Sequence, residues 1–237
     1  MKVTPFRAAL TIGVFAAGAS QIIFAEDGGP HTITANFGAV SNYIWRGQTQ
    51  TDNQSAVQGG IDYNHSSGLY AKTWVSNVDF GAGDQTNYEF DVAAGFGNSI
   101  NDDLSYDINL TYISYPDVDD IDFAELGGSV TFKWITAGMN YTVYGQVDNS
   151  SAYDVGDIYY HAALDFELLY NLGLNLHAGY YDFDAPNVTD YTNWGISISR
   201  SAGDFGTVSL NYDQLDSDTE GAYDEDPKIW IGWNKTF

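Results

Sequence analysis

The sequence predicts an all-β protein, namely a transmembrane, antiparallel, up-and-down β-barrel of about twelve strands. Three observations predict this fold. Apolar and polar residues alternate with a period of two in segment after segment, the connections between these segments alternate between long and short, and the chain ends in an alternating segment. Bacterial outer-membrane barrels combine an apolar outward face with long outer loops, short periplasmic turns and an even number of strands. The repetition carries the prediction, because a single alternating segment would be weak support.

The N-terminal region is typical of an exported protein. Lys2 and Arg7 begin a mostly apolar stretch that ends at Ala25, after which the composition becomes acidic and glycine-rich. We therefore expect a signal peptide over residues 1–25, followed by a single outer-membrane barrel domain over 26–237. No later stretch approaches the roughly 18 consecutive apolar residues of a membrane helix. The absence of cysteine excludes disulfides and thiolate metal sites.

Alternation predicts the strands in chain order. Residues of one parity are mainly apolar at 33–39 (Ile, Ala, Phe, Ala), 57–63 (Val, Gly, Ile, Tyr), 88–96 (Tyr, Phe, Val, Ala, Phe), 104–112 (Leu, Tyr, Ile, Leu, Tyr), 126–134 (Leu, Val, Phe, Trp), 135–143 (Ile, Ala, Met, Tyr, Val), 160–170 (Tyr, Ala, Leu, Phe, Leu, Tyr), 174–180 (Leu, Leu, Ala, Tyr), 194–198 (Trp, Ile, Ile), 208–212 (Val, Leu, Tyr) and 229–237 (Ile, Ile, Trp, Phe). A further strand spans about 69–79, but both of its parities carry apolar residues, so its orientation stays open. Lys235 interrupts the apolar parity of the last strand.

The connections give independent support. Long connections fall at 41–56, 81–87, 115–124, 145–157, 184–191 and 214–227, and short ones at 65–68, 97–103, 133–135, 171–173 and 200–204. If the first strand starts in the periplasm, every long connection lies outside the cell. A soluble β-sandwich, which is the rival fold, has no reason to alternate in this way.

The parity opposite the apolar one is polar and acidic, so we expect it to line the lumen. Its carboxylates are Asp62, Glu89, Asp91, Asp107, Glu125, Asp165, Glu167 and Asp213. Lys133 is the base expected on this face, and Lys72 joins it in one orientation of the 69–79 strand. Rings of carboxylates favour cations in channels. A plugged barrel, in which these acids pair with Lys72, Lys133 and Arg46, is the alternative, although the acids outnumber the bases.

Arg46 stands out in a chain with so few bases, within Tyr43-Ile-Trp-Arg-Gly47. It is either a constriction charge in the barrel mouth or, as we favour, an anchor that fixes the first loop to lumen carboxylates. The predicted pore-lining residues are therefore Asp62, Glu89, Asp91, Asp107, Asp165, Glu167, Lys133 and Arg46.

Enzymatic activity is not expected. Only His161 and His177 are predicted to point inward, and the chain contains no Gly-x-Ser-x-Gly nucleophile motif. We accordingly predict no catalytic, cofactor-binding or dedicated metal site.

Charge limits the partners. The chain has 8 Lys and Arg against 32 Asp and Glu, a formal net charge of −24, and nucleic-acid binding needs basic patches instead. Acidic residues concentrate in the long connections at 117–122 and 216–226. These loops either bind divalent cations weakly or are simply solvated. The expected partners are outer-membrane lipid and lipopolysaccharide, together with small solutes or cations.

The segment Asn42-Tyr-Ile-Trp-Arg-Gly-Gln-Thr-Gln-Thr-Asp-Asn53, followed by residues 55–63, resembles the opening of the TorF family of porin-like proteins, and residues 68–74 and 76–80 continue the resemblance. The resemblance implies an outer-membrane β-barrel of a Gram-negative bacterium and implies no substrate. Lys72 stands where the family is expected to have a small residue, which leaves the orientation of the 69–79 strand open.

Together these observations favour a channel for passive diffusion of small solutes with a preference for cations. The first alternative is a non-conducting barrel with a structural or surface-binding role through its acidic loops. The second is a soluble periplasmic β protein.

Overall fold

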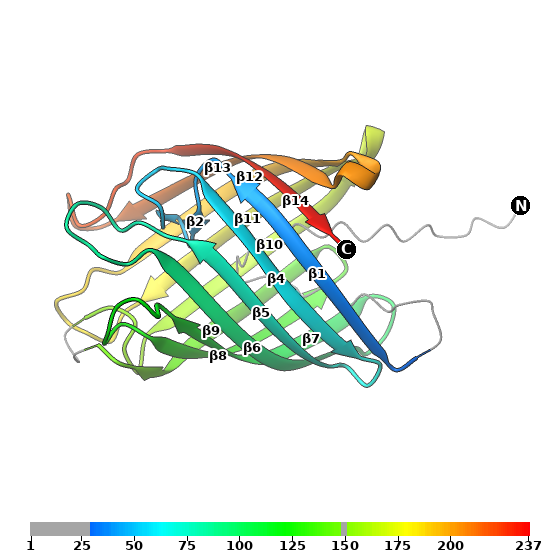
Figure 1. Cartoon of the computed structure of the whole chain (residues 1–237), viewed down its shortest axis with the longest axis horizontal. Coiled ribbons are helices and arrows are strands. Elements are labelled where there is room, and N and C mark those ends of the chain that lie inside the picture. Colours follow the sequence, from blue (N-terminus) through cyan, green and yellow to red (C-terminus); the bar gives the residue numbers. More distant parts are fainter. Residues whose placement is uncertain (1–28, 148–150) are drawn as a thin grey trace, which may run out of the picture.

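The computed structural model describes residues 29–147 and 151–237. Its main element is a closed antiparallel barrel of twelve strands (Figure 1). The barrel strands are β1 (His31–Val40), β4 (Ala56–His65), β5 (Leu69–Asn77), β6 (Tyr88–Ser99), β7 (Leu104–Ser114), β8 (Phe123–Phe132), β9 (Ile135–Gly145), β10 (Ile158–Leu168), β11 (Leu172–Asp182), β12 (Tyr191–Ser201), β13 (Thr207–Ser217) and β14 (Lys228–Thr236). The predicted fold class and strand number are confirmed.

The barrel closes between its first and last strands. β1 pairs with β4 along its whole length, whereas its pairing with β14 runs only from Asn36 opposite Thr236 to Val40 opposite Gly232. Beyond that register, Phe237 donates its N–H to the Ala35 carbonyl at 2.8 Å and accepts the Ala35 N–H at 3.2 Å. The closure leaves no open sheet edge in the barrel wall, which is the condition for strands to cross a membrane.

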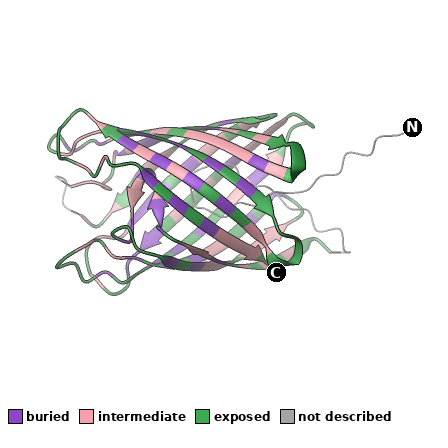
Figure 2. Cartoon of the chain, turned by 90° about the horizontal axis from the view of Figure 1, so that it is seen from above, coloured by how far each residue is buried: buried purple, intermediate pink, exposed green. Residues whose placement is uncertain are grey.

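The two faces of the wall differ in chemistry as the alternation predicts. The outward side chains are apolar and exposed, among them Ile33, Val57, Ile61, Leu110 and Ile231. Figure 2 shows the resulting bands, in which buried and exposed residues follow one another along each strand. Exposed apolar side chains in such a continuous belt are stable in lipid and unfavourable in water, so the barrel is an outer-membrane protein. Among the residues that the structure describes, no helix is long and apolar enough to cross a membrane.

The orientation of β5 is settled by burial. Tyr70 and Trp74 are buried inside the barrel, while Leu69 and Val75 are exposed on the outside. Lys72 shares the parity of Tyr70 and Trp74 and is paired in register with Asp62 of β4. The inward alternative for Lys72 is therefore the correct one.

Long and short connections alternate as predicted, with the long ones at one end of the barrel and the short turns and the C-terminus at the other (Figure 1). The predicted signal peptide, residues 1–25, lies outside the described residues.

The predicted placement of Lys133 is wrong. Lys133 was expected on the lumen side of a strand, but it lies in the short turn between β8 and β9 with φ of +57°. Its side chain is 50% exposed and lies 3.7 Å from Asp103. Because β8 ends at Phe132 and β9 begins at Ile135, Lys133 belongs to neither strand and to neither face of the wall.

The first long connection contains structure that the alternation did not predict. Two short strands, β2 (Ile44–Trp45) and β3 (Gln48–Thr49), form a hairpin within it. Tyr43 and Ile44 are buried, and so is Arg46, although they belong to a loop at the open end of a barrel. The hairpin therefore folds back into the half of the lumen nearer the long connections, which we call the outer half.

Candidate functional site: the acidic lumen and its outer aromatic layer

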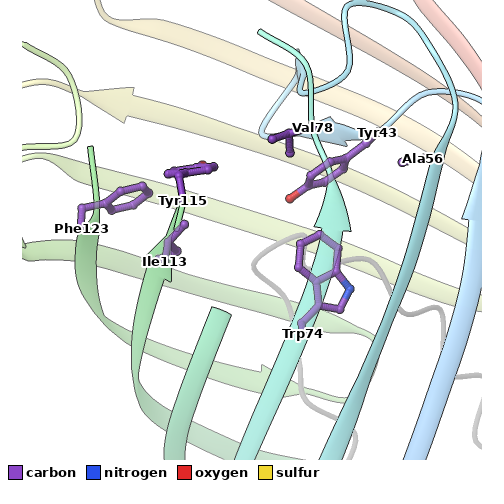
Figure 3. Close-up of a cluster of buried hydrophobic side chains, with 7 residues drawn as sticks. All are labelled: Tyr43, Ala56, Trp74, Val78, Ile113, Tyr115 and Phe123. Carbon is purple, nitrogen blue, oxygen red and sulfur yellow. The ribbon is translucent and has the colours of Figure 1, made fainter. Parts of the chain in front are cut away.

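The outer half of the lumen is filled largely by aromatic side chains. One cluster, shown in Figure 3, consists of Tyr43, Ala56, Trp74, Val78, Ile113, Tyr115 and Phe123. A second consists of Tyr159, Tyr181, Phe183, Tyr191 and Leu215. Trp45 and Tyr153 pack against both clusters. We call the two clusters with Trp45 and Tyr153 the outer aromatic layer.

Arg46 lies at the centre of this layer. Its two terminal nitrogens donate to the two carboxylate oxygens of Glu125 at 2.7 and 2.5 Å. Both side chains are only 3% exposed. The Arg46 Cζ also lies 4.2 Å from the ring centroids of Trp45 and Tyr159, and 5.1 Å from that of Tyr181. A bidentate, water-excluded pair with aromatic faces around it is a strong and directional anchor.

The backbone at this point is unusual. Arg46 has φ of +49° and Gly47 has φ of +86°. A Cβ on Gly47 would lie 2.7 Å from the Cβ of Asn193 on β12, so only glycine fits between the hairpin and the wall. Residues other than glycine adopt positive φ rarely and at some cost. The anchoring contacts of Arg46 must therefore offset the unfavourable backbone conformation.

The other carboxylates of the outer half are bound to the wall and to the hairpin. Glu89 accepts hydrogen bonds from the hydroxyls of Tyr43, at 2.9 Å, and Tyr115, at 3.0 Å. Asp213 accepts from the indole nitrogen of Trp230 at 2.7 Å and lies 3.0 Å from Nε2 of His177. The first group ties the segment before the hairpin to β6 and to the end of β7, and the second ties β13 to β14 and β11.

A second set of carboxylates lies nearer the short-turn end. Asp62 accepts from Asn36 at 3.2 Å, and Asp107 accepts from the Tyr70 hydroxyl at 2.9 Å. Asp165 accepts from Asn175 at 2.8 Å and is exposed, as is Glu167 one step closer to the end of β10. This half has no aromatic layer comparable to the outer one within the described residues. Asp62, Asp107, Asp165 and Glu167 all carry the lumen-facing parity that the alternation predicts, as do Glu89 and Asp91.

Glycines hold several lumen-facing rings against the wall. A Cβ on Gly138 would lie 2.6 Å from Nε2 of His161, and one on Gly195 would lie 2.5 Å from Nε2 of His177. In the same way, a Cβ on Gly95 would overlap the ring of Tyr70, and a Cβ on Gly179 would overlap the ring of Tyr159. A ring that occupies the space of a missing side chain projects less into the lumen.

Several polar atoms on the lumen side have no hydrogen-bond partner among the described residues. They are the second Asp107 carboxylate oxygen, one Asp91 oxygen, His161 Nδ1 and the hydroxyls of Ser197 and Ser199. Buried polar groups are normally satisfied by protein or by water. Their number on one surface favours a hydrated lumen.

Carboxylates in one acidic outer loop accept hydrogen bonds from neighbouring residues and are not simply solvated. Asp117 accepts hydrogen bonds from both nitrogens of Asn87, and Asp122 accepts from the backbone of Tyr115 and the hydroxyl of Tyr112. These carboxylates cap turns and strand ends. No group of three or more His, Cys, Asp or Glu residues in the described part of the chain is arranged to hold a metal ion.

The sequence profile of a bacterial protein family of unknown function, Gcw_chp, matches residues 24–237. The chain belongs to the Gcw_chp family. The name TorF has no counterpart in this match, so the resemblance to that family stays a prediction. No functionally curated protein matches the chain.

Solved structures of porins share the fold of this Gcw_chp barrel. The KdgM porin superimposes with a TM-score of 0.55 at 7% sequence identity, over 86% of this chain and 98% of the porin. The NanC porin gives a TM-score of 0.55 at 9% identity, with the same coverage of 86% and 98%. At such low identity the likeness establishes the barrel architecture and leaves the transported solute open.

The sequence analysis found Arg46 but missed most of what surrounds it. Glu125 was recognised as an inward carboxylate, without its pairing to Arg46. Tyr181 carries the lumen-facing parity of its strand, but Trp45 and Tyr153 carried no signal that places them in the lumen beside it. Trp45 and Tyr153 lie in the first and fourth long connections, where period-two alternation gives no information.

Proposed function

We propose that this Gcw_chp barrel is a porin-like channel through which small solutes cross the outer membrane by passive diffusion, with a preference for cations. A single observation carries the proposal. The inward face of a closed, lipid-exposed barrel is polar and acidic, and its carboxylates outnumber its bases. The inward carboxylates are Asp62, Glu89, Asp91, Asp107, Glu125, Asp165, Glu167 and Asp213, and the inward bases are Lys72, Arg46 and Lys228.

The bases do not cancel this charge. The charge of Arg46 is paired with that of Glu125, and Lys228 lies 2.7 Å from Asp224 at the loop end of β14. Lys72 is the base on the inward face near Asp62. Walls of low dielectric focus the field of the remaining carboxylates along the lumen, which raises the local concentration of cations. Carboxylate-lined pores favour cations for this reason.

The outer aromatic layer supports a restriction on solute size. The hairpin and the rings around it occupy the lumen at the loop end, whereas the short-turn half has small and polar residues. We therefore expect small conductance and exclusion of large solutes.

The test is single-channel recording of refolded mature protein in a planar bilayer under a salt gradient. We expect discrete conductance steps and a reversal potential on the cation-selective side. The combined variant Asp62→Asn, Asp107→Asn and Asp165→Asn should shift the reversal potential toward zero. A matched variant with Asp117, Asp119 and Asp120 changed to Asn in an outer loop should shift it less. Anion selectivity of the unmodified protein, or an equal shift in both variants, would contradict the proposal.

A second candidate is favoured by the same aromatic layer, namely a non-conducting barrel that supports the membrane or binds partners through its acidic loops. Bilayers that contain correctly folded protein would then stay silent. Replacing residues 44–49 by a short Gly-Ser linker separates the candidates further. A channel narrowed by the hairpin should gain conductance, while a barrel that is filled throughout should stay silent.

The remaining partners are proposals of the same kind. The outward belt is suited to outer-membrane lipid, and the acidic loops could approach lipopolysaccharide phosphates only through bridging divalent cations. Binding of Ca²⁺ or Mg²⁺ to the folded barrel, compared with a variant lacking residues 216–226, tests this directly.

A further inference from the structure

The environment of Arg46 is a complete recognition site for a planar organic cation. A carboxylate binds the two terminal nitrogens, and aromatic rings lie within about 5 Å of the guanidinium carbon. Three of the four contributing groups belong to the barrel wall: Glu125 on β8, Tyr159 on β10 and Tyr181 on β11. Only Trp45 belongs to the same hairpin as Arg46. We therefore expect the wall groups to keep their positions if Arg46 leaves.

The wall groups are also positioned independently of Arg46. The Tyr181 hydroxyl donates to Glu125 at 3.3 Å, and the Tyr159 hydroxyl donates to Asn193 at 3.0 Å. The ring of Tyr181 stacks on Phe183 with centroids 4.2 Å apart and an angle of 5° between the planes. Packing of this kind keeps the site preorganised for whichever cation occupies it.

Arg46 is carried by a short hairpin whose backbone conformation at this point is unfavourable. The hairpin has only two residues in each strand, and Arg46 and Gly47 both have positive φ. The Arg46 Nε, which is buried, has no hydrogen-bond partner among the described residues. These features reduce the net free energy that keeps the Arg46 side chain in the site.

We propose that Glu125, Tyr159 and Tyr181 form a binding site for organic cations that carry a guanidinium or primary ammonium group, and that Arg46 is its internal occupant. The route by which a solute reaches the site rests on the proposed channel function, whereas the binding itself does not. Solutes that also carry a carboxylate bind poorly, because Glu89 and Asp91 share this half of the lumen. Guanidinium binds better than ammonium, because only a planar fork makes the bidentate contact with Glu125.

The test is binding of guanidinium chloride to the variant Arg46→Ala, refolded in detergent and followed by tryptophan fluorescence, since Trp45 contacts the site. Saturable binding is expected, and it should be at least about tenfold weaker in the double variant Arg46→Ala, Glu125→Gln, which lacks the charge-assisted contact. Sodium chloride at equal ionic strength controls for screening. Urea controls for planar hydrogen bonding without charge, and neither should saturate.

Arg46→Lys is the second variant, because it keeps a charge beside Glu125 and should therefore fold even if the alanine variant does not. Its ammonium group is a weaker competitor, so guanidinium should bind it more tightly than the unmodified protein and less tightly than Arg46→Ala. Absence of saturable binding to either variant would overturn the proposal, as would equal binding by urea or equal affinity in the double variant.

The channel and the site fail separately. If Arg46→Ala binds guanidinium and bilayers with the unmodified protein stay silent, the site stands and the channel function falls. If the unmodified protein conducts Na⁺ but neither variant binds guanidinium, the channel stands and the site falls.

Discussion

The phenol ring of Tyr159 lies over Gly179 on the neighbouring strand, so closely that a methyl group on Gly179 would overlap the ring. The same ring forms one side of the Arg46 environment, with its centroid 4.2 Å from the guanidinium carbon. A missing side chain on β11 thus determines how far a ring on β10 stands from the wall. The position of the first loop depends in turn on that ring.

The variant Gly179→Ala tests this dependence. The added methyl must displace Tyr159, and overpacking of this kind costs about 1–3 kcal/mol. Gly128→Ala is the matched control, because a Cβ there meets no atom closer than 4.0 Å. It should change stability by no more than about 0.5 kcal/mol. Urea unfolding in lipid vesicles measures both, and equal stability of the two variants would contradict the prediction.

The pair Arg46–Glu125 should be far more sensitive to substitution than the pair Lys133–Asp103. Glu125→Gln leaves a buried charge without its counter-ion, which costs about 3–5 kcal/mol. Asp103→Asn removes half of a pair whose side chains are 50% and 57% exposed, and should cost less than about 1 kcal/mol. The free energy of unfolding of each variant decides the matter. A loss for Glu125→Gln no larger than that for Asp103→Asn would show that the buried pair does not anchor the hairpin.

Trp45 should limit conductance. Its ring lies 6.2 Å from that of Phe123 in one cluster and 6.4 Å from that of Tyr181 in the other, so it joins the two clusters of the outer aromatic layer. Trp45→Ala should raise single-channel conductance, because it removes the largest side chain of the hairpin from the lumen. Trp134→Ala is the control, since Trp134 is exposed in a short turn. The result to be excluded is an equal change of conductance in both variants.

One loop contact should make stability depend on pH. Lys228 donates to the Asp224 carboxylate and lowers its pKa below the ordinary value of about 4. The lowered pKa contributes stability above the unfolded-state value, and this contribution is lost as the pH falls through the folded-state value. Asp224→Asn should therefore reduce the free energy of unfolding near pH 6, by at most about 1 kcal/mol because the Asp224 side chain is 50% exposed and its charge is screened by solvent. The difference from the unmodified protein should vanish near pH 2.

The charge-matched variant Asp119→Asn, in another exposed loop, controls for the general effect of removing a carboxylate. If its pH profile matches that of Asp224→Asn, the contact with Lys228 is not the cause.

The barrel wall could be predicted from the sequence because alternation is a local property. A strand with Leu104, Tyr106 and Ile108 on one parity reports its lipid-facing side whatever its neighbours are. The β5 strand could not be oriented in this way, since Trp74 faces the lumen and is as apolar as Val75, which faces lipid. An aromatic layer inside a barrel removes the contrast on which alternation depends.

The candidate site could be predicted only in part, because it is made by contacts between distant segments. Lumen-facing parity identified Asp62, Glu89 and Asp107 from their own strands. Pairing of Arg46 with Glu125, seventy-nine positions later, depends on how the first loop turns inward. Lys133 was misplaced for a local reason, since the turn it occupies begins at the residue where alternation was expected to continue.

The unequal pairing at the seam has a consequence for assembly. β1 keeps its full length of contact with β4, but it shares only a short register with β14. Every hairpin from β4 to β13 can form between neighbours, while the wall becomes watertight only when the two most distant strands meet. Shortening β14 would leave β1 with an unpaired edge, so we expect such a variant to fail to insert rather than to insert in proportion to the pairing that remains.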